Sequence, residues 1–339
     1  MQLKDIAAFQ SALVTWFEAS GKDYPWRQTT DPWHILVSEV MLQQTQVATV
    51  LNRGFYVNFL KRYPTPKSIA YAPEQEILSA WEGLGYYRRV RNLQKAARAI
   101  SEEHGGHFPT DHQTILKLPG IGRYTAGAIA SFAYNQAQPI VDANVARVLS
   151  RVFNFRDRVD NGPGQKQLWS WAEQVLDHQH PRLFNSALME LGQRVCTNKA
   201  PDCLLCPIRA FCTATEPESL PVKQARKKTV HLDEHCLLAI RTTSAGEKEL
   251  LLSQASQGDR RSGMWSLPQR PLEQLEPFDL LYRANYAITH HKVHLQIYHY
   301  TEALDQSDGE VWHAINTLAD TPIPSPFRKA LDQVLPECF

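Results

Sequence analysis

The pattern of apolar positions divides the chain into a helical part and a part with strand-like runs. From residue 3 to about 213, apolar residues recur at the three- and four-residue spacing of one helix face. Gly and Pro separate these segments at 83–85, 105–109, 119–122 and 162–164. After residue 231, "HCLLAI", "ELLLS" and "VHLQIYHY" (293–300) indicate short strands, and "FRKALDQVL" predicts a last helix. We therefore expect an all-α region at 1–213, a linker at 214–231 and an α+β domain at 232–339.

Composition and charge refine this picture without naming a function. The chain of 339 residues is 43% hydrophobic, which is normal for a globular protein of two domains. Its start lacks the features of a signal peptide, and no apolar run approaches a membrane span, so we expect a cytoplasmic protein without membrane association. Residues 1–230 carry 27 Lys and Arg against 20 Asp and Glu, whereas the remainder carries 9 against 15. The first part could favour a polyanion, although ordinary scatter of surface charge explains the numbers equally well.

The stretch "SEVMLQQTQVATV" (38–50) combines a helical apolar stripe with polar groups. The stripe runs from Leu36 to Leu51; Glu39 stands at its edge and Gln44 falls on it, where a core helix would carry Leu. Burial at such an edge can raise the pKa of a carboxyl group toward neutrality, as a general acid requires. The helical pattern alone leaves the role of Glu39 open.

A second motif, "LPGIGRYTAGAIASFAY" (118–134), places Gly120 and Gly122 in a tight turn that leads into a helix. Such a turn presents backbone N–H groups to a phosphate, although a plain helix-to-helix turn would need the same glycines. The apolar helix before it and the small-residue helix after it favour a helix–hairpin–helix that binds the DNA backbone.

Asp142, in "QPIVDANVARVLSRV", allows two interpretations. Taken alone it suits a helix N-cap better than a catalyst. It also follows the apolar pair Ile140–Val141, so its carboxylate could be held at a fixed and buried place.

Four of the six cysteines lie within 17 residues, spaced C-x6-C-x2-C-x5-C. In a cytoplasmic protein this spacing indicates a metal. Zinc more often uses two short Cys pairs, and four thiolates also suit a [4Fe–4S] cluster, which we favour. The four are Cys196, Cys203, Cys206 and Cys212.

The segment "WEGLGYYRRVRNLQKAA" (81–97) presents Tyr86 and Tyr87 beside Arg88, Arg89 and Arg91. Aromatic rings can stack on bases while Arg side chains neutralise phosphates. A helix with a solvated basic face and tyrosines packed beneath it fits the same residues, and the two interpretations are equally favoured by the pattern.

Together these motifs resemble the helix–hairpin–helix DNA glycosylases with a C-terminal iron–sulfur loop, the superfamily of endonuclease III. The similarity is greatest to its adenine glycosylase (MutY) branch. "PWR" (25–27), "SEVMLQQTQV" (38–47), "GLGYYRRVRNL" (83–93), "LPGIGRYTAGAI" (118–129) and the cysteine spacing occur in the order typical of that family. The resemblance implies an all-α helix–hairpin–helix glycosylase region with an iron–sulfur loop at 196–212. A smaller α+β domain similar to the hydrolase MutT, but without hydrolase activity, would follow.

The resemblance also implies a reaction and roles for individual residues. It implies a monomeric, monofunctional adenine DNA glycosylase of base excision repair, with one [4Fe–4S] cluster. Its partner would be double-stranded DNA in which adenine faces 8-oxoguanine or guanine. Glu39 would protonate the flipped adenine at N7, and Asp142, with Asn144 beside it, would stabilise the oxocarbenium-like sugar. The implied adenine pocket comprises Trp26, Arg27, Leu42 and Ser186. The implied DNA contacts are Gln43, Gln44, Thr45, Tyr86, Arg88, Gly120, Gly122, Thr289 and His290, with Tyr86 wedged beside the opposing base.

Tyr124 separates two reactions. Glycosylases that also cut the strand carry at this position a Lys that forms a Schiff base, and a phenol cannot do so. We therefore expect base removal without efficient strand cleavage.

Three positions depart from the family pattern. Ala143 replaces the usual Gly between the catalytic Asp and Asn, so a methyl group enters the turn there. Ser186 replaces a Gln or Glu that would hydrogen-bond adenine. Ile288-Thr289-His290 stands in place of the Phe-Ser-His loop that reads 8-oxoguanine, and retains only its hydroxyl and imidazole.

Three other functions compete with this one. The first is an endonuclease III-like glycosylase/lyase for oxidised pyrimidines, which Tyr124 and the C-terminal domain disfavour. The second is a non-catalytic DNA-structure binder, in which Glu39 and Asp142 would be accidental. The third is a nucleotide pyrophosphatase in the last domain, but "PQRPLEQLEPFDLL" lacks the clustered glutamates that would hold a divalent metal.

Overall fold

The computed structural model describes residues 3–225, 228–256, 258, 261–301, 304 and 306–338. The chain forms two compact units: residues 1–70 with 92–225, and residues 71–91 with 226–339. The sequence pattern predicts the change near residue 226. It gives no sign that 71–91, in the middle of a helical run, packs with the C-terminal residues.

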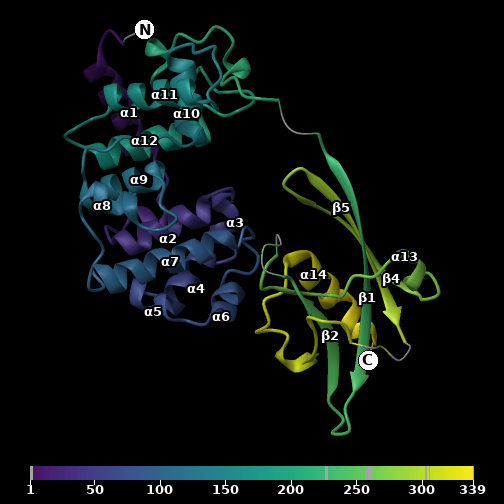
Figure 1. Ribbon diagram of the computed structural model, residues 1–339. Helices are drawn as coiled ribbons and strands as arrows, with labels where there is room; N and C mark the ends of the chain where they lie inside the picture. Colours follow the sequence, from purple (N-terminus) through teal and green to yellow (C-terminus); the bar gives the residue numbers. More distant parts are fainter. Residues whose placement is uncertain are drawn as a thin grey trace. The chain divides into compact units, whose positions relative to one another are not determined.

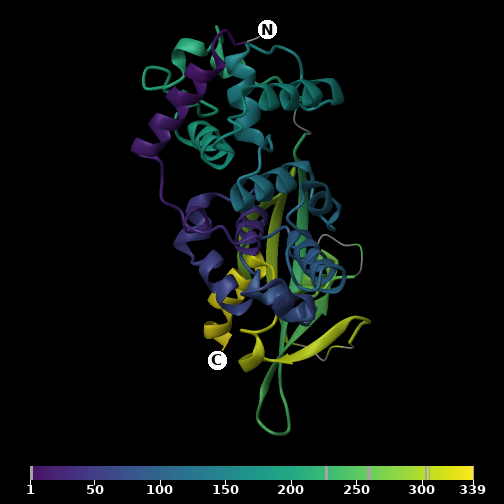
Figure 2. The same ribbon diagram turned by 90° about the vertical axis from the view of Figure 1, so that its left-hand side faces the viewer.

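The first unit is helical, as the periodicity predicts. In both views its helices form two groups, with α1, α10, α11 and α12 at one end and α2–α5 and α7–α9 at the other (Figures 1 and 2). Helix α12 packs against α1, α9 and α10, and α2 packs against α9. The bounds are α1 Ile6–Ser20, α2 Pro32–Leu42, α3 Val47–Asn52, α4 Phe55–Arg62, α5 Pro66–Ala70, α7 Arg88–Glu103, α8 His112–Lys117, α9 Arg123–Tyr134, α10 Ala143–Val152, α11 Gly162–Val175 and α12 Pro181–Arg194. Helix α7 begins in the second unit and ends in the first.

Side-chain caps fix where several of these helices begin. A carboxylate or amide at the N-cap accepts a hydrogen bond from one of the backbone N–H groups that the first turn leaves unpaired. This cap is present at α1, α2, α8, α10 and α11, from Asp5, Asp31, Asp111, Asp142 and Asn161 respectively.

The apolar stripe at 36–51 is interrupted, which the periodicity does not show. Helix α2 ends at Leu42, and α3 begins at Val47 after a turn in which Gln44 has a φ of 59°. Gln44 therefore lies in an exposed turn between two helices, and not on a continuous helical face.

The second unit is built on a sheet with strand order β3-β2-β1-β5-β4, and β6 also pairs with β2 (Figure 1). β1 and β5 run parallel; the other pairs are antiparallel. The strands are β1 Val230–Thr242, β2 Lys248–Gln254, β3 Trp265–Ser266, β4 Leu280–Ile288, β5 His291–Tyr300 and β6 Glu310–Ala314, and the helices are α6 Glu74–Ala80, α13 Leu272–Leu275 and α14 Ser325–Val334.

Helix α14 covers one face of this sheet. Its Phe327 and Leu331 are buried with Leu252 and Ile297, because alternate strand residues point to the same face. Leu237, Leu251 and Tyr298 form a smaller cluster with Leu275 of α13. The α+β class predicted for residues 232–339 is confirmed. No helix among the described residues is long and apolar enough to cross a membrane.

Candidate active site

Glu39 and Tyr124 come together where α2 packs against α9. Glu39 is only 6% exposed, and the hydroxyl of Tyr124 donates a hydrogen bond of 2.6 Å to its Oε2. The same hydroxyl lies 3.9 Å from Sδ of Met189, on α12. The second helix of the helix–hairpin–helix thus supplies a partner to the candidate acid.

Burial changes the protonation of both side chains. It raises the pKa of Glu39 from 4.5 to about 7, a rise that the hydrogen bond from Tyr124 opposes and the charge of Asp142 reinforces. Burial also raises the pKa of Tyr124 well above its usual value, and the negative charge of Glu39 adds to this effect. Tyr124 therefore remains a hydrogen-bond donor near neutral pH, whereas Glu39 is poised to give up a proton there.

The N-cap interpretation of Asp142 is confirmed, and its catalytic role stays a prediction. It is the N-cap of α10, where its Oδ1 accepts the N–H of Val145 at 2.7 Å. Its Oδ2 accepts the side-chain amide of Asn144 at 2.8 Å, and its charge acts on Glu39. Burial raises its pKa against these hydrogen bonds. One carboxylate thus begins a helix and lies within electrostatic range of the candidate acid.

Ala143 fits the position that a glycine occupies in the family. It is the first residue of α10 and is not among the described residues with positive φ, so its methyl group causes no backbone strain. It is also exposed, and this departure from the family pattern leaves the turn intact.

Arg147 connects Asn144 to the cysteine loop. Its Nη2 donates to Oδ1 of Asn144 at 2.9 Å, and its Nε donates to the backbone oxygen of Cys196 at 2.7 Å. Arg151, one turn further along α10, donates to Sγ of Cys196 at 3.2 Å and to the oxygen of Thr197 at 2.7 Å. Two arginines of α10 therefore hold the beginning of the loop.

The four thiols of this loop lie within electrostatic range of one another. The pKa of Cys206 is raised to about 11, mainly by burial and in part by the three other cysteines, against a backbone hydrogen bond from Ile208 that lowers it. Across the described ranges, no group of three or more His, Cys, Asp or Glu side chains is close enough to hold a metal ion. The chemistry of the donor set, four thiols in one short loop, fits a soft metal or an iron–sulfur cluster.

The turn of the helix–hairpin–helix requires its first glycine. Gly120 has a φ of 75°, and a Cβ there would lie 2.6 Å from Cβ of Asn92. Gly122 caps α9 with open space where a Cβ would be. Both glycines are exposed, so the N–H groups at the start of α9 can be approached by a phosphate.

The tyrosine pair of the 81–97 segment divides between the two interpretations. Tyr86 has a φ of 50° and is 48% exposed, whereas Tyr87 is buried. Arg88 is exposed, but Arg89 is buried and donates to the backbone oxygens of Leu84 and Gly85 at 2.9 and 3.0 Å. Tyr86 and Arg88 are therefore free to meet a ligand, while their neighbours shape the turn.

A pocket of about 270 Å³ lies beside α12. Of the four residues that the resemblance assigns to the adenine pocket, Arg27 and Ser186 line it and Trp26 and Leu42 do not. Trp26 instead stacks on Tyr24, with ring centroids 5.2 Å apart. The other lining residues are Phe17, Asn135, His180, Arg182 and Leu183.

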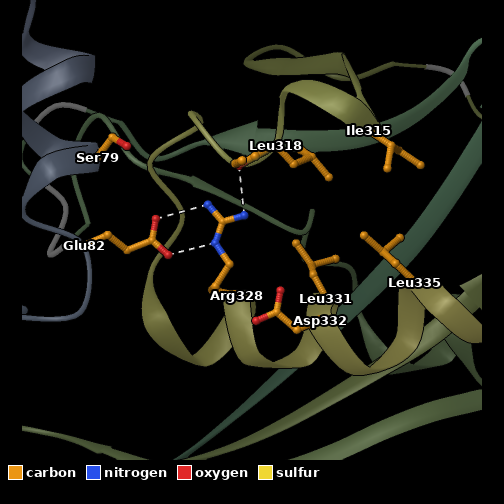
Figure 3. Close-up of a pocket in the computed structure, with 9 residues that line it drawn as sticks. Ser79, Glu82, Ile315, Leu318, Arg328, Leu331, Asp332 and Leu335 are labelled. Atoms are coloured by element: carbon orange, nitrogen blue, oxygen red, sulfur yellow. Dashed lines mark hydrogen bonds and ion pairs between the residues drawn. The ribbon is translucent and has the colours of Figure 1, made fainter. Parts of the chain in front are cut away.

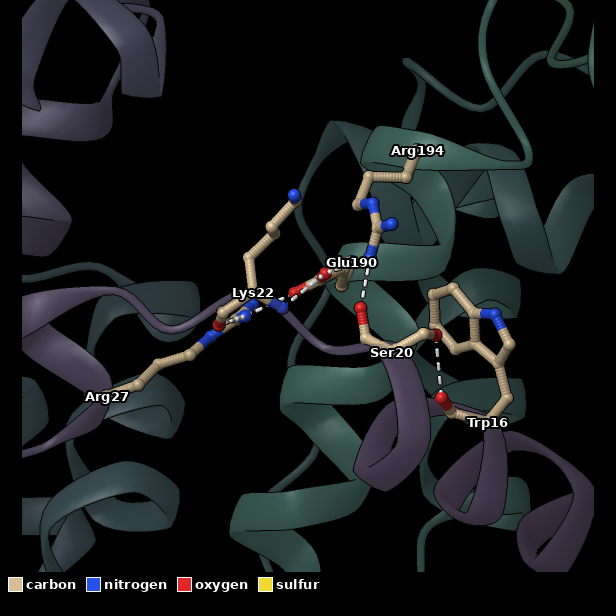
Figure 4. A network of polar contacts seen from close by, with 6 residues as sticks. All are labelled: Trp16, Ser20, Lys22, Arg27, Glu190 and Arg194. Carbon is tan, nitrogen blue, oxygen red and sulfur yellow. Dashed lines mark hydrogen bonds and ion pairs between the residues drawn. The ribbon is translucent and has the colours of Figure 1, made fainter.

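Glu190 is a residue of this region that sequence reasoning missed. Its fully buried carboxylate pairs with Arg27, with Arg194 at 2.8 Å, and with the backbone N–H of Lys22 at 2.8 Å (Figure 4). Arg27 also donates to the oxygen of Lys22 at 2.7 Å. The "PWR" segment is thus fixed to α12. In the sequence, Glu190 stands among the apolar residues of "SALMELG" (186–192), and this position could have indicated a buried carboxylate.

Thr289 and His290 form the turn between β4 and β5 in the second unit, at the turn that the sequence predicts. Thr289 has a φ of 55°, and its hydroxyl donates to the oxygen of Ile288 at 2.7 Å. Thr289 is exposed at the end of the hairpin, and His290 is half-buried.

Comparison with known proteins places this site in a family. Residues 37–174 match the HhH-GPD superfamily base excision DNA repair protein. Curated relatives named adenine DNA glycosylase include one from Homo sapiens, 39% identical over 278 residues (78% of this chain, 50% of that protein), and one from Mycobacterium tuberculosis strain H37Rv, 42% identical over 199 residues (58% and 64%). The chain therefore spans about half to two thirds of the length of these relatives.

Solved structures agree at the level of the fold. A thermostable thymine-DNA glycosylase is 30% identical, with a TM-score of 0.56 over 61% of this chain and 95% of that one. A non-covalent complex of endonuclease III with DNA gives a TM-score of 0.52 at 22% identity and the same coverage, which supports the helical fold alone. With its hairpin, its buried acid and these relatives, the chain belongs to the HhH-GPD superfamily of base excision DNA repair proteins.

Proposed function

We propose that this protein is a monofunctional adenine DNA glycosylase, acting on adenine opposite 8-oxoguanine or guanine in duplex DNA. One observation carries the proposal: Glu39 is buried, bound by the Tyr124 hydroxyl and has a pKa near 7. A carboxyl group in this state can donate a proton at physiological pH. The names of the curated relatives support the choice of adenine.

The reaction begins with a flipped adenine, which is a poor leaving group as an anion. Glu39 gives its proton to N7, the C1′–N9 bond breaks, and adenine departs as a neutral base. The sugar keeps the positive charge, which the Asp142 carboxylate stabilises. Water adds its oxygen to C1′ and loses a proton to a carboxylate, leaving an abasic site. Tyr124 orients the acid and contributes no amine, so no Schiff base forms.

We propose that the α+β domain recognises the opposing base, as the MutT-like domain of the family does. The β4–β5 turn, with the exposed Thr289 and the half-buried His290 at its tip, offers a hydroxyl and an imidazole for this purpose. Guanine and 8-oxoguanine differ by an oxygen at C8 and a proton at N7, a difference that a few hydrogen bonds can detect. The excess of acidic residues in this domain suits local recognition better than a broad phosphate contact.

We further propose that the four loop cysteines hold one [4Fe–4S] cluster, as the resemblance implies. Such a cluster would supply cross-linking of the loop, and base removal requires no electron transfer. The presence of four thiols in one short loop, whose first cysteine is held by Arg147 and Arg151, supports this proposal. Iron and sulfide analysis of protein prepared with iron available tests this; stoichiometric zinc without iron would contradict it.

A single-turnover assay tests the main proposal. Duplexes carry adenine opposite 8-oxoguanine, guanine or cytosine, or thymine opposite guanine, and strand breaks are counted before and after alkali. We expect product from adenine opposite 8-oxoguanine or guanine, and only after alkali, because base removal alone leaves the strand intact. Excision of thymine instead would indicate the activity in the name of the thermostable relative. Breaks without alkali would indicate a lyase.

The Glu39→Gln variant links this activity to the site. Gln keeps the shape of Glu but cannot donate the proton, so we expect the excision rate to fall by about 10² to 10⁴-fold with duplex affinity retained. Glu18→Gln, an exposed position on α1, is the matched control. Excision by Glu39→Gln within a few-fold of the control would refute the assignment.

A further inference from the structure

The turn that carries Tyr86 has a strained backbone. Gly83, Gly85 and Tyr86 have φ values of 92°, 67° and 50°. A large residue at positive φ persists only where its surroundings hold it. The indole N–H of Trp81 donates to the oxygen of Gly85 at 3.1 Å, and Arg89 donates to the same oxygen at 3.0 Å.

The residue that precedes this turn is bound by the C-terminal helix. Glu82 accepts two hydrogen bonds from Arg328 of α14, Nε to Oε1 at 2.8 Å and Nη2 to Oε2 at 3.1 Å (Figure 3). Both side chains are about one-fifth exposed. Arg328 also donates to the backbone oxygens of Leu318 and Thr321, at 2.9 and 2.8 Å. Its guanidinium is therefore rigidly held when it meets Glu82.

A second set of contacts lies on the other side of the turn. Arg91 donates to the backbone oxygen of Ser262 and, at 2.6 Å, to Oε1 of Glu74. The amide of Gln75 donates to the oxygen of Gly263 at 3.1 Å. The Tyr86 turn is thus bracketed in sequence by Glu82 and Arg91, both of which contact residues beyond 226.

From this arrangement we propose that Arg328 and Glu82 are positioning residues for opposing-base discrimination. Through their ion pair, the position of the Tyr86 side chain depends on the domain that carries Thr289 and His290. The inference rests on the proposed function, in which Tyr86 wedges beside the base that this domain recognises. A planar, two-contact Arg–carboxylate pair fixes orientation as well as distance, as such positioning requires.

The test uses the full chain and compares single-turnover excision of adenine opposite 8-oxoguanine and opposite guanine. Glu82→Ala and Arg328→Gln are each expected to reduce the preference for 8-oxoguanine by about tenfold, the effect of losing a well-formed charged contact. The charge exchange Glu82→Arg with Arg328→Glu should restore part of it. Arg241→Gln is the matched control. Nε of Arg241, on β1, donates to Oε2 of Glu249, on β2, at 2.7 Å, so this variant also breaks an Arg–Glu pair of the second unit. Among the described residues, Arg241 has no hydrogen bond or ion pair with 71–91.

A double-mutant cycle separates positioning from general stability. If Glu82 acts through Tyr86, the double variant Glu82→Ala with Tyr86→Ala should lose little more of the preference for 8-oxoguanine than Tyr86→Ala alone. If the two residues act independently, their losses of preference should add. Glu82→Ala also decides the outcome if Arg328→Gln fails to fold. An unchanged preference in a folded Glu82→Ala protein, within about twofold, or additive effects in the cycle, would overturn the inference. Absence of adenine excision by the wild-type protein would instead refute the proposed function.

Discussion

Glu39 keeps its proton at a pH where an ordinary carboxyl group has lost it, because the helices around it exclude water. The Tyr124 hydroxyl partly offsets this effect by favouring the charged form. Asp142 is held by the N–H of Val145 and the amide of Asn144, which favour its charged form. Burial outweighs these hydrogen bonds, so the pKa of Asp142 is raised as well.

The pH dependence of excision should follow from this arrangement. The acid must be protonated, so we expect the single-turnover rate to fall roughly tenfold per pH unit above about pH 7. Asp142 must be ionised, and its raised pKa moves the acidic limb above the range of a free Asp. Rates measured from pH 4 to pH 10 check both limbs; a rate that rises steadily beyond pH 8 would contradict the role of Glu39.

The same shift predicts a dependence of stability on pH. The pKa of Glu39 is higher in the folded protein, about 7, than in the unfolded chain, 4.5, so its contribution is fully present below pH 4.5 and is lost as the pH rises through 7. Relative to Glu39→Gln, the wild type should lose roughly 3 kcal/mol of unfolding free energy between pH 4.5 and pH 8. Urea unfolding of both proteins at the two pH values measures this. If wild type and Glu39→Gln lose the same unfolding free energy between these pH values, the prediction is wrong.

The Tyr124→Phe variant should move the alkaline limb of the pH–rate profile to higher pH. Its hydroxyl lowers the pKa of Glu39 by stabilising the carboxylate, so without it the pKa rises further and the limb shifts to higher pH. The profile of Tyr124→Phe is compared with that of Tyr134→Phe, a tyrosine of the same helix whose hydroxyl contacts the oxygen of Phe108. A limb that stays in place or moves to lower pH would show that the hydrogen bond does not set this pKa.

At the scale of elements, periodicity predicted the long helices and the strand at 293–300 because each has one buried face. It could not show the break at 43–46, because apolar residues recur at helical spacing on both sides of the turn in which Gln44 has a positive φ. Strand β4 was not predicted from "LLYRANYAI", whose side chains are half-buried or exposed and show little alternation of hydrophobicity. The candidate acid and Asp142 were found from local pattern and resemblance, whereas Glu190 depends on a partner more than 160 residues away.

Helix α12 provides a prediction at this scale. Glu190→Gln removes a fully buried charge and leaves Arg27 and Arg194 without their counter-ion. We expect a loss of about 3 kcal/mol of unfolding free energy, near the lower end for broken buried pairs because both arginines are partly exposed. Glu173→Gln, an exposed position on α11, should change it by less than about 0.5 kcal/mol. Equal stability of the two variants would show that the ion pairs contribute little.

At the scale of the whole molecule, the two units do not coincide with two continuous stretches of sequence. Residues 1–230 contain Glu39, Tyr124 and Asp142 and lack every residue that Glu82 and Arg91 contact beyond 226. We therefore expect this shortened chain to retain some excision of adenine opposite guanine and to lose its preference for 8-oxoguanine. Single-turnover rates on both duplexes measure this, and an unchanged preference would remove the C-terminal domain from recognition.

The Glu82–Arg328 pair joins residues 246 positions apart in the chain, and this has a consequence for biosynthesis. At roughly 5–20 residues per second, the ribosome delivers Arg328 about 12–50 seconds after Glu82. During that interval, residues 71–91 exist without the strands and helix that complete their unit. We therefore expect the turn that carries Tyr86 to reach its folded conformation late, although its residues lie in the first third of the chain to be synthesised.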